Sequence, residues 1–423
     1  MEPKPSLTIR DSSEILSQIS EKYSITRNLS IELCKPLNTE DYVVQPVVDV
    51  SPPKWHLART TWFFEELILK KQHEYKVFHP DFSYFFNSYY ESVGKRVLRP
   101  NRGLMTRPPL EEIFLYREYI DTHMIEFLKN RPGKEELAII ELGINHEQQH
   151  QELLLTDIKY ILGHNPLFPI YKELEEFIDP DLTSSLLNVE GGIYVIGHQD
   201  NKFSYDNERS PHKVFIEPFR AMDRLVTAGE YLEFIEDGGY DEFRWWLSEG
   251  WDWVKQLDEK APMYWHKVDG KWHHYTLHGF ERINPNEPVT HISYYEADAY
   301  SHWKQKRLLN EFEWEVLANS YGVATTEGFV DGASYHPGTQ KNGNNQLMGY
   351  GWEWTQSAYL PYPGFKIEDG ALGEYNGKFM INQMVLRGGS VATSLNHIRT
   401  TYRNFFHPQL RWQFTGLRLA ESN

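Results

Sequence analysis

The sequence predicts a two-domain α+β protein, with a helical domain over residues 1–178 and an irregular α+β domain over residues 179–423. Three observations support this prediction. The chain has 423 residues, which allows two or three domains at roughly 100–200 residues each. Helical periodicity dominates the first part, and short strand-like pieces between turns dominate the second. Hydrophobic residues make up 40% of the chain, so it can bury a substantial core.

Four amphipathic segments are expected to form helices in the first domain. The first begins with a capping box at Asp11–Glu14. The second follows Pro52 and Pro53, because proline is favoured where a helix starts. The second, third and fourth helices are expected at about residues 55–71, 109–129 and 134–163. Four such helices joined by loops are typical of a bundle.

The second domain is expected to hold short elements packed by aromatic side chains. A strand is predicted at residues 191–197, between glycines. Two short helices are predicted at residues 296–306 and 311–318. Glycine, asparagine and aromatic residues dominate the segment 320–423, which favours an irregular architecture over a regular layered sheet.

Composition excludes several classes of function. The chain has 43 Lys+Arg against 60 Asp+Glu, a net charge of −17. This charge disfavours binding to nucleic acid or to an anionic membrane surface. Cys34 is the only cysteine, so an intrachain disulfide and a cysteine-based metal site are both excluded. Without a signal-like segment or an apolar run of about 18 residues, we expect a soluble cytoplasmic protein.

The strongest chemical signal is a pair of histidines in the segment Asn145–Glu152. On a helix, His146 and His150 lie one turn apart on the same face, so both imidazoles can reach one divalent ion. The same pattern also fits two solvated histidines on a helix surface. It matches the HExxH motif of zinc peptidases as well, with Glu147 as general base.

The residues alone do not decide which side chain is the third ligand of such a centre. A zinc peptidase needs a downstream ligand, such as Glu175 or Glu176. The other choice is His56, at the start of the second helix, which would complete a set of three imidazoles. Three histidines leave up to three open positions on a six-coordinate ion, an arrangement that suits Fe(II) holding a substrate and dioxygen together.

Neighbouring residues are assigned by helix geometry and chemistry. At about 100° per residue, Gln149 lies roughly 60° from His146 and can face the outer sphere of the ion. Glu152 points elsewhere, which favours a supporting role. Arg99 and Arg102 lie in the long loop before the third helix. They are candidates to bind a substrate carboxylate, with Arg99 as the first choice, because a guanidinium binds carboxylates bidentately.

The chain resembles the ergothioneine-biosynthesis sulfoxide synthases, or hercynine oxygenases, over nearly its whole length. Ser51–His56 and the histidine motif resemble their N-terminal DinB-like four-helix bundle. The second half resembles their domain related to formylglycine-generating enzymes and C-type lectins. The matching pieces of that half are Gly191–Tyr194, Phe203–Glu208, Pro288–Ser293, Arg307–Trp314, Trp352–Thr355, Leu386–Ser390 and Gly416–Ala420.

The resemblance implies an activity and a ligand set. Such enzymes hold non-haem Fe(II) through three histidines, which correspond here to His56, His146 and His150. They use O2 to join the sulfur of a cysteine-type thiol to the imidazole C2 of hercynine, leaving a sulfoxide. Gln149 matches a glutamine on the hercynine side. A true formylglycine-generating enzyme needs a cysteine pair in its domain, which this sequence lacks.

The resemblance also suggests proton donors and substrate contacts. Tyr89 and Tyr90 are implied as acid or redox tyrosines, and Tyr375 is a further candidate. Aromatic side chains are expected to hold the trimethylammonium group of hercynine by cation–π attraction. The substrate-binding candidates of the C-terminal segment are Asn404, Phe405 and Phe406.

The sulfur donor is predicted from a difference between that segment and the corresponding segment of one branch of the family. Asn404–Phe406 lies where the branch that uses γ-glutamylcysteine has Asn-Trp-Asp, followed four residues later by arginine. Here these charged positions are Phe406 and Leu410, so free cysteine is the expected donor. A selenoneine synthase-type relative that uses a selenium donor is one alternative. A zinc peptidase and a non-enzymatic lectin-like module are the others.

Overall fold

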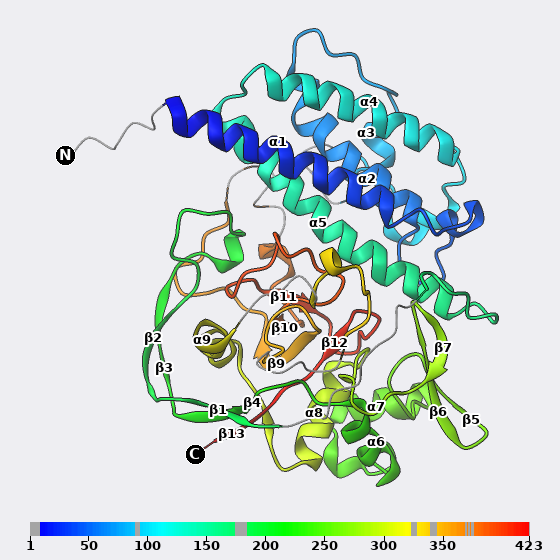
Figure 1. Cartoon of the computed structure of the whole chain (residues 1–423), viewed down its shortest axis with the longest axis vertical. Helices are drawn as coiled ribbons and strands as arrows, with labels where there is room; N and C mark the ends of the chain where they lie inside the picture. The colour runs from blue at the N-terminus through cyan, green and yellow to red at the C-terminus, as the bar shows by residue number, and fades with distance from the viewer. Residues whose placement is uncertain are drawn as a thin grey trace. The chain divides into compact units, whose positions relative to one another are not determined.

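A computed structural model describes residues 9–88, 94–173, 184–322, 328–338, 345–368, 370, 373 and 376–422, with side chains from residue 14 onward. The chain divides into two compact units, Met1–Ile161 and Leu162–Asn423. Helices make up most of the first unit, and short strands and helices make up the second (Figure 1). The predicted α+β class is therefore confirmed. The predicted boundary between residues 178 and 179 lies outside the described residues.

Four long helices lie alongside one another in the first unit (Figure 1). Three shorter pieces are 3-10 helices, at Thr39–Val43, Leu69–Lys71 and Arg99–Leu104. The α-helices are α1 (Ile9–Glu32), α2 (Pro53–Leu67), the short α3 (Phe82–Phe85), α4 (Leu110–Lys129) and α5 (Lys134–Gly163). The predicted segments 55–71, 109–129 and 134–163 match α2 with its 3-10 extension, α4 and α5. The capping box was wrong, because α1 already includes Ile9 and Asp11 lies inside it.

Helix α2 is the central helix of this unit, since every residue from Pro53 to Glu65 is buried. Helix α5 approaches it closely at Gly143. A Cβ atom at Gly143 would lie 2.6 Å from Phe64 and 2.8 Å from Phe63, distances at which carbon atoms clash. Glycine at this position therefore allows α5 to pack directly on α2. This close packing sets the distance between the histidines that the two helices carry.

The second unit is built from four small sheets. Their strand orders are β1-β4-β13-β8, β11-β10-β9-β12, β2-β3 and β5-β6-β7. All pairs are antiparallel except β9 with β12, where Trp352 pairs with Thr415. The strands are β1 (Leu186–Val189), β2 (Gly192–Ile196), β3 (His212–Ile216), β4 (Phe219–Met222), β5 (Trp265–Val268), β6 (Lys271–Thr276), β7 (Gly279–Arg282), β8 (Arg307–Leu308), β9 (Trp352–Ala358), β10 (Met384–Arg387), β11 (Asn404–Phe406), β12 (Thr415–Gly416) and β13 (Leu419–Ser422).

The described residues of the second unit also form four α-helices. They are α6 (Ala228–Glu236), α7 (Ser248–Leu257), α8 (Tyr294–Trp303) and α9 (Glu311–Tyr321). Side-chain caps mark the start of α6, α8 and α9. Helix α8 begins two residues earlier than the predicted segment because Ser293 and Glu296 form a capping box. The hydroxyl of Ser293 accepts a hydrogen bond from the Glu296 amide at 3.2 Å, and the Glu296 carboxylate accepts one from the Ser293 amide at 2.7 Å.

Buried ion pairs connect distant segments of the second unit. Arg403 donates to both carboxylate oxygens of Glu311, at 2.8 and 3.0 Å, across 92 residues of sequence. Arg418 pairs in the same bidentate way with Glu353, at 2.9 Å to each oxygen. Such pairs fix the positions of short elements, because removing one partner leaves a buried charge without compensation.

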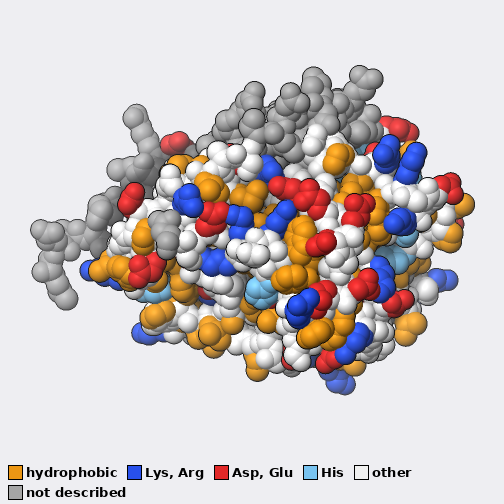
Figure 2. Space-filling view, turned by 90° about the horizontal axis from the view of Figure 1, so that it is seen from below, with side chains coloured by type: hydrophobic (Ala, Val, Ile, Leu, Met, Phe, Trp, Pro, Cys, Tyr) orange, Lys and Arg blue, Asp and Glu red, His pale blue; other side chains and the backbone are white. Residues whose placement is uncertain are grey.

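The surface in Figure 2 carries acidic, basic and apolar side chains interspersed, so the negative net charge is not gathered on that face of the described residues. None of the described helices combines the length and the apolar character that crossing a bilayer requires.

Candidate metal centre

His56 lies in the first turn of α2, and it is buried. Pro52 precedes the helix in extended conformation and Pro53 occupies its first position, so the chain enters the helix at a fixed angle. The amides of Trp55 and His56 both donate to the carbonyl of Pro52. The local sequence therefore places the imidazole at the well-ordered start of the most buried helix of the unit.

Helix α5 brings two more imidazoles to the same place. His146 and His150 are one turn apart, and their ring centroids lie 4.6 Å from each other. The ring of His56 lies 5.1 Å from that of His150. His146 is buried, whereas His150 retains some solvent exposure. Three imidazoles from two helices are thus gathered within the first unit.

The orientation of His56 is set by a carboxylate. Its Nε2 lies 3.0 Å from Oδ2 of Asp157, and its Nδ1 lies 2.9 Å from Nδ1 of His150. Asp157 also accepts the backbone amide of Ser51 at 2.8 Å. A histidine that ligates a metal commonly donates its other ring N–H to a carboxylate. Because Nε2 faces Asp157, Nδ1 is the nitrogen of His56 that faces His150.

The distance between the two Nδ1 atoms has a simple interpretation. Two adjacent ligands of an octahedral ion with metal–nitrogen bonds of roughly 2.1 Å lie about 3 Å apart. The 2.9 Å separation matches this value. The ring of His146 lies beside that of His150, with 4.6 Å between the two ring centroids.

The electrostatics keep the imidazoles of α5 neutral. Burial, the positive charge of Arg59 and the neighbouring His56 hold the pKa of His146 well below its ordinary value. Enclosure by the protein likewise lowers the pKa of His150, with further contributions from His146, His56 and two arginines. A neutral imidazole is the form that ligates a metal, because its lone pair is not occupied by a proton.

Glu147 does not face this centre. Its two oxygens accept hydrogen bonds from Ser30 at 2.6 Å and from Arg27 at 2.9 Å, and Arg117 also donates to it. Burial raises the pKa of Glu147, but Arg117 and Arg27 lower it by more, so the pKa falls below its ordinary value. A carboxylate held by two guanidinium groups inside the helices is poorly suited to serve as the general base of a zinc peptidase.

The two arginines of the loop occupy different environments. Arg99, the first choice from the sequence, is exposed and donates to the carbonyl of Asp49 at 2.7 Å. Arg102 donates to the hydroxyls of Ser51 at 2.9 Å and Ser88 at 2.7 Å, and its guanidinium carbon lies 4.0 Å from the ring centre of Trp55. Its charge also contributes to the low pKa of His150. Arg102 is therefore the arginine that lies near the histidines.

The remaining candidates are distributed over both units. Gln149 is half-buried on α5, next to His150. Asn404, Phe405 and Phe406 form β11 in the second unit, where Phe405 stacks on Tyr359 with ring centroids 4.0 Å apart. Outside the described residues lie Tyr89, Tyr90, Tyr375, Glu175 and Glu176.

Asp157 and Ser51 were not identified from the sequence. Asp157 follows His150 by seven residues on α5, two turns further along the same face. That spacing is a usable signal for a carboxylate that supports a histidine centre. The role of Ser51 carries no such signal, because it rests on a backbone amide and on the packing of the chain that leads into α2.

Comparisons with known proteins show which proteins this chain is similar to. Residues 175–347 and 333–423 match the family model of the sulfatase-modifying factor enzyme 1-like domain. Hercynine oxygenase of Mycolicibacterium smegmatis is 31% identical over 88% of this chain and 91% of its own length. Hercynine oxygenase of Mycobacterium tuberculosis is 33% identical over 70% of this chain and 74% of its own length. Ergothioneine biosynthesis protein 1 of Schizosaccharomyces pombe is 25% identical over 61% of this chain and 33% of its own length.

Proposed function

The chain belongs to the hercynine oxygenase family, the sulfoxide synthases of ergothioneine biosynthesis, and we propose that it performs this reaction with Fe(II) and O2. Its substrates are hercynine and a cysteine-type thiol, with free cysteine as the preferred sulfur donor. The observation that carries the proposal is the group of three imidazoles on α2 and α5, with Asp157 behind His56. The four long helices of the first unit correspond to the DinB-like bundle of the family.

The residues fit the metal that the family implies. His146 and His150 are neutral imidazoles, and hydrogen bonding to Asp157 leaves Nδ1 of His56 as its ligand atom. Imidazole donors suit iron, and three of them leave positions open for substrates. When bound, Fe(II) would supply the redox-active centre and the coordination sites for O2 activation, whereas the net electrons come from the two organic substrates. The protein supplies the ligand set, its orientation and a largely buried surrounding.

The reaction balances without a further reductant. The C2–H bond of hercynine and the S–H bond of cysteine break, and one C–S bond forms. One oxygen atom of O2 becomes the sulfoxide oxygen, and the other leaves as water with the two hydrogens. Both organic substrates are oxidised and O2 is reduced. Binding both organic substrates side by side removes the entropic cost of bringing them together in solution, which is a large contribution to the rate.

Arg102 is the residue we propose for binding the carboxylate of cysteine, in place of Arg99. Its guanidinium now holds two hydroxyl groups, from Ser51 and Ser88, and lies in a network that continues through Ser51 and Asp157 to His56. A carboxylate would replace the hydroxyls with a bidentate, charge-assisted pair. Gln149, beside His150, is proposed to contact hercynine. Asn404, Phe405 and Phe406 are proposed as further substrate contacts from the second unit.

One assay tests the reaction and the donor together. The protein is loaded anaerobically with Fe(II), and O2 uptake and product mass are measured with hercynine plus cysteine, γ-glutamylcysteine, a selenium donor or cysteamine. Cysteine is expected to give the fastest turnover and a sulfoxide product. Cysteamine lacks the carboxylate that Arg102 would bind, so it is expected to react with a much higher KM. Faster turnover with the selenium donor would instead indicate a selenoneine synthase-type enzyme.

A substitution tests the histidine centre itself. His56→Ala removes one of three ligands and is expected to abolish both Fe(II) binding and turnover. His123→Ala is the matched control, because His123 is a partly buried histidine on α4 whose ring contacts Tyr75 and Tyr119. It is expected to retain both properties. A fully active His56→Ala variant would exclude the three-histidine centre.

Two other functions make different predictions. A zinc peptidase requires Glu147 as base, and the pairing of this carboxylate with Arg27 and Arg117 argues against that role. A lectin-like binding module predicts no O2 uptake with any pair of thiol and imidazole. Iron-dependent uptake that requires both substrates would exclude both alternatives.

A further inference from the structure

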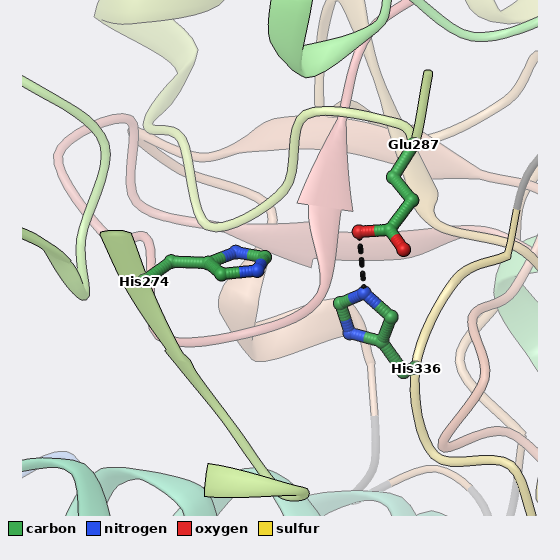
Figure 3. A group of neighbouring side chains, drawn as sticks. All are labelled: His274, Glu287 and His336. Carbon is green, nitrogen blue, oxygen red and sulfur yellow. Dashed lines mark hydrogen bonds and ion pairs between the residues drawn. The ribbon is translucent and has the colours of Figure 1, made fainter. Parts of the chain in front are cut away.

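The second unit contains a cluster of three metal-binding side chains that plays no part in the proposed reaction. His274, Glu287 and His336 offer ligand atoms that all lie within 4.8 Å of one another. Figure 3 shows the two rings and the carboxylate directed toward a common space. Glu287 and His336 are buried, and His274 is half-buried. Within the described residues, this is the cluster that meets the distance criterion for a metal ion.

The three side chains come from separate segments. His274 lies on β6, Glu287 lies in the loop that follows β7, and His336 lies 49 residues further along the chain. Nε2 of His336 is 2.8 Å from Oε2 of Glu287. The rings of His274 and His336 are 5.6 Å apart and nearly perpendicular, at 80°. Perpendicular rings at this distance are compatible with two nitrogens directed at one ion.

Hydrogen-bonded backbone holds the segments of His274 and Glu287 in place. His274 pairs with Trp265 on one side and Glu281 on the other, in the middle of the three-stranded sheet. The Glu287 carbonyl accepts the amide of Ala228 at 2.7 Å, and a β-bridge joins the next residue, Pro288, to Thr227. The site is therefore already assembled, and an ion would not have to order the chain.

His278 is close to the cluster but is used differently. Its ring lies 6.3 Å from that of His336. Both of its nitrogens are 2.7 Å from backbone carbonyl oxygens, those of Lys172 and Ser334. These contacts direct the imidazole toward the backbone and away from the cluster. The donor set consequently consists of two imidazoles and one carboxylate.

We propose that His274, Glu287 and His336 form a second divalent metal site, of the kind that binds Zn²⁺. Two histidines and a glutamate are a recurrent zinc ligand set, with a fourth position left for water. Imidazole ligands disfavour Ca²⁺ and Mg²⁺, which prefer oxygen donors. The ion would tie together three segments of a unit whose sequence contains no cysteine and so no disulfide. The proposal does not depend on the activity of the first unit.

Metal binding is measured in the full chain with the first centre disabled. A His146→Ala, His150→Ala double variant serves as the background. Zinc that this variant binds then reports on the second unit. Glu287→Gln is then added, because glutamine can still hydrogen-bond His336 but is a weak zinc ligand. His274→Asn is a second test variant at a half-buried position. His273→Asn is the matched control, since His273 lies on the opposite face of the same strand.

The background protein is stripped of metal and equilibrated with Zn²⁺ or Ca²⁺, and bound metal and the melting temperature are recorded. We expect one bound Zn²⁺ per chain and a higher melting temperature with Zn²⁺, because a ligand that binds the folded state stabilises it. Glu287→Gln and His274→Asn are each expected to weaken Zn²⁺ binding at least tenfold. His273→Asn is expected to bind as the background does.

Three outcomes would overturn the site. The first is a background protein that binds no Zn²⁺. The second is an equal loss of binding in His273→Asn, which would indicate scattered surface histidines. The third is binding of Ca²⁺ as tight as that of Zn²⁺. Circular dichroism checks the fold of each variant, and His274→Asn decides the question if Glu287→Gln does not fold.

Discussion

The two histidine clusters of this protein are built in different ways. In the first unit, His56, His146 and His150 lie on two long helices, and Asp157 lies on the same helix as two of them. In the second unit, His274 lies on a short strand, whereas Glu287 and His336 lie in loops. Helical spacing is regular and can be recognised in a sequence. Three residues joined only by tertiary packing leave no such spacing.

The buried carboxylates of the two units show the same contrast. Glu147 is held by Arg27 from α1 and Arg117 from α4, so its ion pairs cross-link long helices. Glu208 is held by Arg399, 191 residues away, and by Thr401 at 2.7 Å. Both carboxylates are fully surrounded by protein, and both rely on their guanidinium partners. The first network links α5 to α1 and α4, and the second joins distant segments of an irregular unit.

The largest expected effect is on the stability of the first unit. Glu147→Ala leaves Arg117 buried without its carboxylate partner and leaves Arg27 with Asp121 alone, and it is expected to cost about 3–5 kcal/mol. Helical ellipticity at 222 nm during urea unfolding reports this unit, because it contains the four longest described helices. The control is Glu135→Ala at the exposed first turn of α5, with an expected loss below about 1 kcal/mol.

The same variant separates the two interpretations of the HExxH pattern. If Glu147 were a catalytic base, its removal would abolish activity while stability stayed near that of wild type. A stable but inactive Glu147→Ala protein would therefore contradict the structural role described above. A destabilised protein whose folded fraction still binds Fe(II) would support it.

The helical unit was largely predictable from the sequence. Helix α5 begins and ends where predicted, and the i, i+4 spacing predicted that His146 and His150 share one face, where their ring centroids lie 4.6 Å apart. Where the Glu147 side chain points was not predictable, because the HExxH pattern does not indicate whether arginines from other helices surround that residue. The preference for Arg99 over Arg102 as the carboxylate-binding residue stays a prediction. Both arginines lie in one loop, and only tertiary structure shows which of them approaches the histidines.

The second unit was less predictable. The strand at 191–197 and the two helices α8 and α9 were found within a few residues. Helices α6 and α7 and the sheet β5-β6-β7 were not predicted, since their packing rests on aromatic contacts with distant residues. Tyr231 of α6, for example, stacks on Tyr300 of α8 with ring centroids 5.2 Å apart. The cluster of His274, Glu287 and His336 was missed because no short motif contains it.

A moderate effect is expected at the carboxylate behind His56. Asp157→Asn keeps an oxygen that can accept the amide of Ser51 but loses the negative charge that polarises the imidazole. Substitutions of this kind typically weaken metal binding 10–100-fold. Anaerobic titration with Fe(II), or with Co²⁺ followed by its absorption spectrum, measures the change. Turnover at saturating iron is expected to recover in part, because the three ligands remain.

Asp121→Asn is the matched control for this prediction. Asp121 is another partly buried carboxylate of the same unit, bonded to Tyr23 and Arg27 at 2.6 Å each. It is expected to affect stability but not metal affinity. If both variants bind Fe(II) as tightly as wild type, Asp157 does not support His56 as a metal ligand. A carboxylate behind a histidine would then no longer distinguish the first cluster from the second.

The smallest expected effect is a pH dependence in the second unit. Burial raises the pKa of Glu208, but Arg399 and hydrogen bonds lower it by more, so the pKa falls below its ordinary value. The unfolded chain therefore takes up a proton at this residue before the folded chain does, and stability falls as pH drops below about 4.5. Glu208→Gln removes this contribution. Its free energy of unfolding is expected to be lower at neutral pH and to depend less on pH in acid, by at most about 1.4 kcal/mol per pH unit.

Tryptophan fluorescence is the appropriate probe for that measurement, because only Trp55 and Trp62 of the 13 tryptophans lie in the first unit. The exposed Glu190→Gln serves as control, with the pH profile of wild type expected. If Glu208→Gln has the same pH profile of unfolding free energy as wild type, the ion pair between Glu208 and Arg399 contributes little to stability. The irregular unit would then depend on its aromatic packing, and the parallel with Glu147 in the helical unit would fail.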